Sequence, residues 1–123
     1  SADDAEAAMA ELHRVGARAV LLKGGHLVEG DDVIDRFTDG VSRRTFVHPR
    51  LPLRAHGTGC SLSSAIAARL CAGQSLATAC KGAGDYVFEA LRAGYHPGRS
   101  DIVVLDHVGT ITSHIPENKK AGE

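Results

Sequence analysis

The sequence predicts an α/β fold in which a β-hairpin interrupts a series of helices and strands, and three features support this class. A helical pattern over residues 3–15 leads into an uninterrupted apolar run at residues 19–22, as in sheets covered by helices. The dipeptide Asp39-Gly40 separates two strand-like segments and is typical of a hairpin turn. Residues 60–71 are rich in Ala and Ser, which favours a helix packed closely against a sheet.

The first predicted helix is capped by Asp3 and Asp4 and ends at Gly16. Its apolar positions recur at helical spacing, at Ala5, Ala8, Met9, Leu12 and Val15. The run at residues 19–22 shows no alternation of apolar and polar residues, so we expect a strand covered on both faces.

The predicted hairpin has strands at residues 32–38 and 41–48, and its turn at Asp39-Gly40 suits type I′ with both residues at positive φ. We expect the charged side chains of this hairpin to lie on ordinary solvated faces; they are Asp35, Arg36 and Asp39.

The second half continues with a loop at residues 51–56, a helix at residues 60–71 and a second helix from Ser75 to about Arg92. A short apolar run at residues 102–105 predicts a strand. Residues 111–123 are predicted to be a disordered tail, which leaves residues 1–110 as the folded domain.

Composition excludes several function classes. The chain has 123 residues, 43% of them hydrophobic, enough for one domain with a core. A formal net charge of −1 and the absence of Trp argue against binding to nucleic acid or to an anionic membrane. There is neither a signal-peptide pattern nor an apolar run of about 20 residues. We therefore expect a cytoplasmic protein.

Cysteine and histidine give no sign of a metal site. Cys60, Cys71 and Cys80 form an odd set without a CxxC pair, which argues against both a disulfide framework and structural zinc. The seven His residues are scattered and include no HExxH motif, so we expect no metal bound by His. We expect Cys71 and Cys80 to be core residues.

The segment His56-Gly57-Thr58-Gly59-Cys60 is the strongest candidate site. Gly57 and Gly59 let the backbone turn so that consecutive N–H groups point one way, and the following helix adds a partial positive charge. These donors can hold a phosphate without a Lys or Arg at the same position. The same residues could instead form a turn required only for packing. The segment matches neither GxxxxGK[ST] nor GxGxxG.

Cys60 lies in the first turn of this helix, where the positive end of the dipole favours a thiolate. It could act as a general base or as a nucleophile, or it could be a small residue that fills space.

Lys23 follows the strand at residues 19–22, and Gly24 and Gly25 permit a tight turn or a close approach of the backbone to a ligand. Because ligands of open α/β sheets bind at the carboxyl ends of strands, Lys23 could contact phosphates there. A surface lysine is the alternative, and His26 is expected to face solvent.

The order and spacing of these motifs resemble the phosphomethylpyrimidine kinase family. The resemblance is carried by residues 19–26, by the hairpin and by residues 56–67, and it extends from about residue 1 to residue 94. It implies the C-terminal portion of a ribokinase-like three-layer α/β/α fold. It also implies phosphorylation of hydroxymethylpyrimidine and its monophosphate by ATP, assisted by Mg²⁺, in thiamine biosynthesis.

The resemblance also implies roles for particular residues. Gly57, Thr58, Gly59 and Cys60 would form the anion hole through their backbone N–H groups, and Cys60 would be the catalytic base. The nucleotide would be bound by a set that includes Lys23, Gly24, Gly57 and Gly59. The family usually reads Asn-Thr-His-Gly-Thr-Gly-Cys, whereas this chain has Arg54-Ala55 before His56, so a hydroxyl and an amide beside the phosphates are absent.

Family members are about twice as long as this chain, and the part absent here would supply much of the sheet and the pyrimidine pocket. We therefore expect this chain to self-associate as a homo-oligomer or to associate with a missing N-terminal half. Two other functions remain open: a pyridoxal kinase of the same fold and a catalytically silent nucleotide-binding remnant.

Overall fold

A computed structural model describes residues 1–27, 30–55, 57–94, 101–103 and 105–107. It contains α1 (Ala2–Arg14), β1 (Val20–Leu22), β2 (Asp32–Thr38), β3 (Arg43–Pro49), β4 (Arg54–Ala55), α2 (Thr58–Cys71), α3 (Leu76–Arg92) and β5 (Ile102–Val103). Strands β1, β2 and β3 form an antiparallel sheet in that order, and β4 pairs in parallel with β5. The fold is α/β, as predicted.

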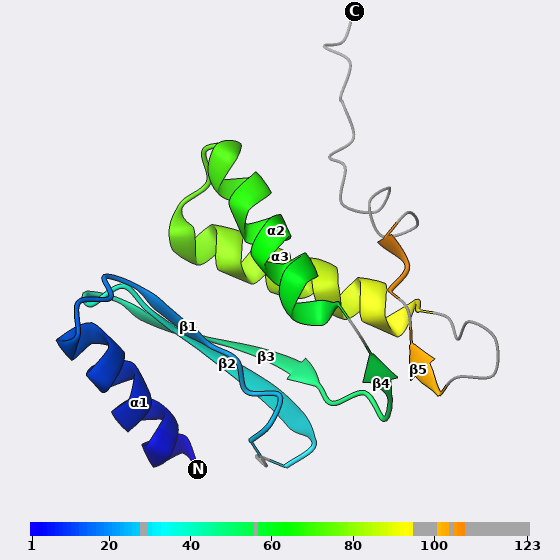
Figure 1. Ribbon diagram of the computed structural model, residues 1–123, viewed down its shortest axis with the longest axis horizontal. Coiled ribbons are helices and arrows are strands. Elements are labelled where there is room, and N and C mark those ends of the chain that lie inside the picture. Colours follow the sequence, from blue (N-terminus) through cyan, green and yellow to red (C-terminus); the bar gives the residue numbers. More distant parts are fainter. Residues whose placement is uncertain (28–29, 56, 95–100, 104, 108–123) are drawn as a thin grey trace, which may run out of the picture.

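The elements form layers (Figure 1). Helix α1 covers one face of the three-stranded sheet and contacts β1, while the antiparallel pair α2 and α3 covers the other face, with α3 in contact with β3. The core between the sheet and the helix pair contains Phe37, Phe46 and Cys80. Burial raises the pKa of the Cys80 thiol, so this predicted core cysteine is inert at neutral pH. No helix among the described residues is long and apolar enough to span a membrane.

Helix α1 begins one residue earlier than its predicted cap at Asp3 and Asp4. The cap is Ser1, whose Oγ accepts the Asp4 N–H at 3.3 Å while the Asp4 carboxylate accepts from the Ser1 N-terminus at 3.0 Å. This reciprocal arrangement is a capping box, so Asp4 is the third helical residue and supports the cap instead of forming it.

Strand β1 differs from the prediction of a strand covered on both faces. It pairs with β2 only, in antiparallel register, and of its three residues Val20 alone is buried. Among the described residues its other edge has no partner strand. The apolar composition of residues 19–22 is typical of a buried strand, but the described residues provide a partner strand on one edge only.

The hairpin strands are confirmed, but the predicted type I′ turn is wrong. Four residues separate the paired residues Thr38 and Arg43, and among the described non-glycine residues none has positive φ. Gly40 alone adopts the left-handed conformation in this turn, at φ +86°. The Asp39 carboxylate accepts the backbone N–H groups of Val41 and Ser42 at 2.9 and 2.6 Å, which favours the longer loop over a two-residue turn.

Two other predictions change in detail. The segment predicted as a loop at residues 51–56 contains β4, whose partner β5 lies far along the sequence and so leaves no local signal. Cys71, predicted to be a core residue, is exposed at the last position of α2. Helix α3 follows its predicted cap Ser75. His56 and the predicted tail at residues 111–123 lie outside the described residues.

Candidate phosphate-binding site

Helix α2 begins with an uncapped, glycine-dependent turn. Gly57 is its N-cap at φ +83°, a conformation that L side chains rarely adopt, and in the part of the chain that the structure describes no side chain caps the first turn. The first intrahelical bond runs from the Ser61 N–H to the Gly57 carbonyl at 2.9 Å. The N–H groups of Thr58, Gly59 and Cys60 therefore have no acceptor within the helix.

The surroundings of these glycines bear on the alternative that the turn serves only packing. A Cβ added to Gly57 or to Gly59 would meet nothing within 4 Å among the described residues. Gly57 is thus required by its backbone conformation, and Gly59 leaves open space beside the free N–H groups. The geometry favours an anion cradle over a packing turn.

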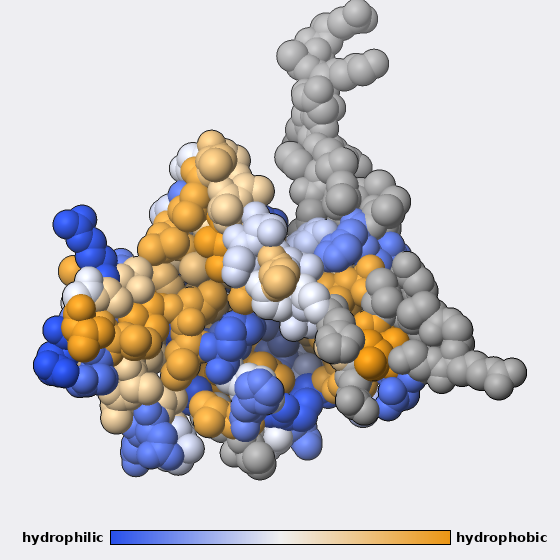
Figure 2. All heavy atoms as spheres, viewed as in Figure 1, coloured by the Kyte–Doolittle hydropathy of each residue, from blue (hydrophilic) through white to orange (hydrophobic). Residues whose placement is uncertain are grey.

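A groove of about 430 Å³ lies between the sheet and the helix pair, at the first turn of α2. Thr58 and Gly59 line it from α2, and Lys23, Gly25 and Asp35 line it from the sheet side. In Figure 2, hydrophilic side chains gather around a hollow near the centre of the face shown. The groove brings the predicted phosphate lysine and the predicted anion hole to one cavity.

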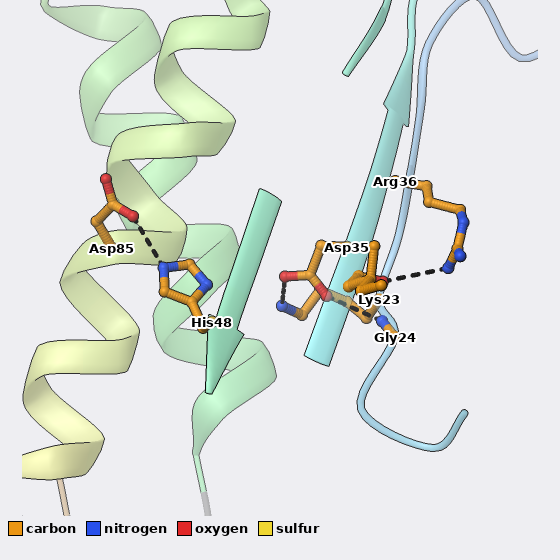
Figure 3. A network of polar contacts seen from close by, with 7 residues as sticks. Lys23, Gly24, Asp35, Arg36, His48 and Asp85 are labelled. Atoms are coloured by element: carbon orange, nitrogen blue, oxygen red, sulfur yellow. Dashed lines mark hydrogen bonds and ion pairs between the residues drawn. The ribbon is translucent and has the colours of Figure 1, made fainter. Parts of the chain in front are cut away.

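Lys23 is held by a buried carboxylate (Figure 3). Its ammonium forms an ion pair with Oδ2 of Asp35, and Oδ1 of the same side chain accepts the Gly24 N–H at 2.9 Å. The Lys23 side chain is half exposed, whereas Asp35 is 4% exposed. Lys23 is therefore neither a free surface lysine nor a buried one.

Gly24 and Gly25 have different roles. A Cβ on Gly24 would lie 2.0 Å from the carbonyl oxygen of Ile34, so Gly24 is needed for close approach to β2. Its N–H is used by Asp35, and it does not line the groove. Gly25 does line the groove, and a Cβ there would meet nothing within 4 Å.

The prediction that Asp35 and Arg36 lie on solvated faces is wrong, since both are buried. Asp35 shares its face of β2 with Val33 and Phe37, which lie two residues before and after it. That alternation was a usable signal: a carboxylate in an apolar row must be paired or it would cost several kcal/mol. Arg36 lies on the opposite face and donates from Nη1 to the Ile34 carbonyl at 3.3 Å.

His48 forms a further part of the groove that the sequence did not reveal. Its Nε2 lies 2.9 Å from Oδ1 of Asp85 on α3, and its ring stacks on Phe88 with centroids 4.8 Å apart. Lys81 donates to the other oxygen of Asp85 at 2.7 Å. Burial raises the pKa of Asp85, but the hydrogen bonds from Lys81 and His48 outweigh it and lower the pKa below its usual value.

Arg50 fixes the loop that follows β1. Its guanidinium donates to the carbonyls of Gly25 at 2.9 Å and Leu27 at 2.7 Å. Its backbone N–H donates to the Asp31 carbonyl at 2.8 Å. These bonds hold the backbone of Gly25 against the groove wall.

Cys60 lies on the other side of the same helical turn. It is exposed and lines an open hollow of about 600 Å³, together with Ser61, Tyr86 and His107. The Tyr86 hydroxyl lies 2.8 Å from Nδ1 of His107, and the two rings are stacked. The first turn of α2 thus borders two hollows, the groove through Thr58 and Gly59 and the hollow through Cys60.

Among the described residues, no group of three or more His, Cys, Asp or Glu side chains is arranged to hold a metal ion. Asp35 is the carboxylate that lines the groove, and it is already paired with Lys23.

Comparison with known proteins identifies the family. Residues 1–105 match the sequence model of the phosphomethylpyrimidine kinase family. The chain belongs to the phosphomethylpyrimidine kinase family. A bifunctional thiamine biosynthesis protein of Geobacter sulfurreducens is 49% identical over 89 residues, which are 72% of this chain and 18% of that protein. The hydroxymethylpyrimidine/phosphomethylpyrimidine kinase of Streptomyces coelicolor is 42% identical over 105 residues, 85% of this chain and 38% of that enzyme.

Solved structures support the ribokinase-like fold. The pyridoxal kinase of Staphylococcus aureus in complex with AMP-PCP matches with a TM-score of 0.79 and 27% identity. The match covers 87% of this chain and 39% of that enzyme. This member of the phosphomethylpyrimidine kinase family thus spans less than half the length of these relatives.

Proposed function

We propose that this chain carries the phosphoryl-transfer part of an ATP-dependent kinase that phosphorylates hydroxymethylpyrimidine and its monophosphate in thiamine biosynthesis. One observation carries the proposal: the uncapped first turn of α2 borders both the groove with Lys23 and the hollow with Cys60. A phosphoryl group held at this turn would have the nucleotide on one side and the acceptor alcohol on the other.

In this arrangement the nucleotide phosphates lie in the groove. The N–H groups of Gly57, Thr58, Gly59 and Cys60 hold the oxygens of the transferring phosphoryl group, and the Lys23 ammonium neutralises charge on the neighbouring phosphates. Gly24 contributes by bringing the chain close to β2, and Gly25 offers backbone at the groove wall.

Cys60 would accept the proton of the substrate hydroxyl. As the oxygen attacks the γ-phosphorus, its bond to hydrogen breaks, the thiolate takes the proton, and ADP leaves with the electrons of the broken P–O bond. The exposure of Cys60 in an open hollow gives an acceptor alcohol access to the sulfur.

Mg²⁺ would reach this site as part of the nucleotide complex. A magnesium ion is commonly bound by phosphate oxygens, waters and one or two carboxylates, and it does not require an all-protein cage. Its chemical contribution would be to neutralise the phosphate charge that develops during transfer.

Pyridoxal kinase is a second candidate, because a pyridoxal kinase matches this fold with a TM-score of 0.79. The curated relatives at 42% and 49% identity have thiamine-pathway names and favour the pyrimidine alcohol. A catalytically silent remnant that retains nucleotide binding is the third candidate. Since the chain is much shorter than its relatives, we propose that it acts in the cytoplasm in association with the rest of a kinase fold or as a homo-oligomer.

The decisive experiment compares substrates in a complete kinase domain that contains this segment. Transfer of ³²P from labelled ATP is measured with hydroxymethylpyrimidine, its monophosphate and pyridoxal. We expect higher kcat/KM for the two pyrimidines than for pyridoxal. Preference for pyridoxal would support the second candidate, and ATP binding without any transfer would support the third.

A further inference from the structure

The proposed phosphate groove contains a buried carboxylate. Asp35 lines the groove and is 4% exposed, in a row with the apolar residues Val33 and Phe37. A negative charge repels phosphate, so its presence beside a phosphate groove requires an explanation other than direct binding.

Both oxygens of Asp35 are occupied by groups that immediately follow β1. Oδ1 accepts the Gly24 N–H and Oδ2 accepts from the Lys23 ammonium. Asp35 itself is fixed by strand pairing, because its neighbour Arg36 pairs with Leu22 and Asp35 pairs with Phe46. The carboxylate is therefore a rigid point on the sheet.

Lys23 is not rigid by itself. A lysine side chain is a flexible four-carbon stem with a point charge, and this one is half exposed. An ammonium has three N–H donors, and one of them is used by Asp35. No other acceptor among the described residues contacts this ammonium, which leaves its remaining donors for phosphate oxygens in the groove. Contact between Gly24 and the Ile34 carbonyl also brings this part of the chain close to β2.

We propose that Asp35 is a positioning residue, which acts on the bound phosphates through Lys23 by fixing where the lysine ammonium meets them. This inference rests on the proposed function, because it requires Lys23 to contact phosphate. Asp35 would thus favour phosphate binding through Lys23, although its own negative charge repels phosphate.

Asp35 has two opposing effects on phosphate affinity, because it positions Lys23 and also repels the phosphate. The direction of the affinity change in a variant therefore shows which effect is larger. If Asp35 positions Lys23, Asp35→Asn weakens phosphate binding although it removes a like charge. In a Lys23→Met background there is no ammonium to position, and the same change removes repulsion only. Asp35→Asn is then expected to tighten binding.

The experiment is a double-mutant cycle on the 123-residue chain, with inorganic tripolyphosphate as the probe and calorimetry as the measurement. We expect Asp35→Asn to weaken binding about tenfold when Lys23 is present, the effect of one charged hydrogen bond. In the Lys23→Met background we expect it to tighten binding about two- to threefold. Tighter binding in both backgrounds, or equal effects in both, would overturn the inference.

Two matched controls separate positioning from general stability. Asp39→Asn makes the same change in the same hairpin, at a carboxylate that holds backbone N–H groups but no lysine. Lys81→Met removes an ion-paired lysine that does not line the groove. Both are expected to leave tripolyphosphate affinity unchanged, and a loss in either control equal to that of Asp35→Asn would contradict a specific role.

A measurement on single variants covers the case in which the double variant does not fold. The ¹³Cε relaxation of Lys23 in the native chain should show a more ordered side chain than after Asp35→Asn, while Lys81 stays unchanged. Equal disorder before and after the change would refute positioning. If the native chain does not bind tripolyphosphate, the proposed function itself fails, whereas binding with an uncoupled cycle rejects the role of Asp35 alone.

Discussion

At the scale of single residues, the cysteines differ in their surroundings and the glycines differ in the reason why glycine is present. Cys60, Cys71 and Cys80 are respectively beside a hollow, at an exposed helix end and in the core. Gly24 is required for close packing, Gly57 for its positive φ, and Gly25 and Gly59 leave open space. The chain therefore provides matched comparisons within its own sequence.

Cys60→Ala is expected to lower kcat of a complete kinase domain about 100-fold or more, since a general base typically contributes that much. Nucleotide affinity should change little, because Thr58 and Gly59 line the groove and Cys60 does not. Stopped-flow turnover and nucleotide titration measure the two effects. Cys71→Ala is the control on the same helix and should leave kcat unchanged. A native kcat in the Cys60 variant would remove it from the mechanism.

Gly24→Ala is expected to destabilise the chain by about 3 kcal/mol, because the new Cβ would lie 2.0 Å from the Ile34 carbonyl oxygen and the backbone at residue 24 would have to move away from β2. Gly25→Ala adds the same methyl group in open space and should change stability by less than about 1 kcal/mol. Urea unfolding measures both. Similar losses for both would contradict the close approach to β2.

At the scale of elements, the first turn of α2 and the hairpin turn both contain backbone N–H groups that no backbone carbonyl of the same turn can accept. In the hairpin an aspartate accepts these groups, whereas at α2 no side chain of the described residues does so. Because helix N-termini with unsatisfied N–H groups are common anion sites, this contrast supports the proposal of a ligand at the start of α2.

Gly59→Ala is expected to separate stability from binding. Alanine favours a helix over glycine by up to about 1 kcal/mol, and the added Cβ meets no described residue. The same methyl group would occupy space beside the free N–H groups, so tripolyphosphate affinity should fall. Thermal unfolding and calorimetry check the two effects, and Gly73→Ala, at φ +89° after α2, serves as a control that should lose stability without losing affinity. Unchanged affinity in the Gly59 variant would argue against phosphate at this turn.

The hairpin turn is expected to depend on pH. Backbone hydrogen bonds from Ser42 and Val41 lower the pKa of Asp39 in the folded chain, so its contribution is present above the unfolded value and is lost as pH falls through the folded pKa. An NMR titration of the Val41 and Ser42 amide shifts should therefore show a midpoint below that of an unperturbed aspartate. A midpoint at or above the ordinary aspartate value would disprove the turn geometry, and Asp39→Asn should abolish the transition.

Much of the element order could be predicted from sequence because it depends on local signals. The cap at Ser75, the hairpin strands and the glycines before α2 are all encoded by neighbouring residues. Pairing of β4 with β5, and of His48 with Asp85, joins residues far apart in sequence and left no local pattern. The burial of Asp35 could be predicted from its place between Val33 and Phe37, because alternation along a strand puts these three residues on one face.

At the scale of the whole molecule, the sheet is open. The described part of β1 has a partner on one edge only, and Leu12, Val15, Val47 and Leu70 are large apolar residues that remain exposed. A chain that spans 38% of its Streptomyces coelicolor relative has room for further elements in that fold. Additional strands at the β1 edge would satisfy its free backbone groups.

We expect the isolated chain to self-associate and to become monodisperse when it is co-expressed with the remaining part of a kinase domain. Sedimentation velocity measures both states, and amide exchange at Val20–Leu22 should slow in the complex because new strand pairing would protect these groups. A well-folded monomer whose β1 amides exchange at the same rate in both preparations would contradict this expectation.

The position of one helical turn between two hollows also has a thermodynamic consequence. Thr58 and Gly59 border the groove while Cys60 borders the second hollow, so a ligand that orders this turn from one side prepares it for a ligand on the other. Linkage requires the benefit to be mutual: nucleotide should raise the affinity for the alcohol by the same factor as the alcohol raises the affinity for nucleotide. The short run from Gly57 to Cys60 would then act as a cooperative element as well as an anion hole.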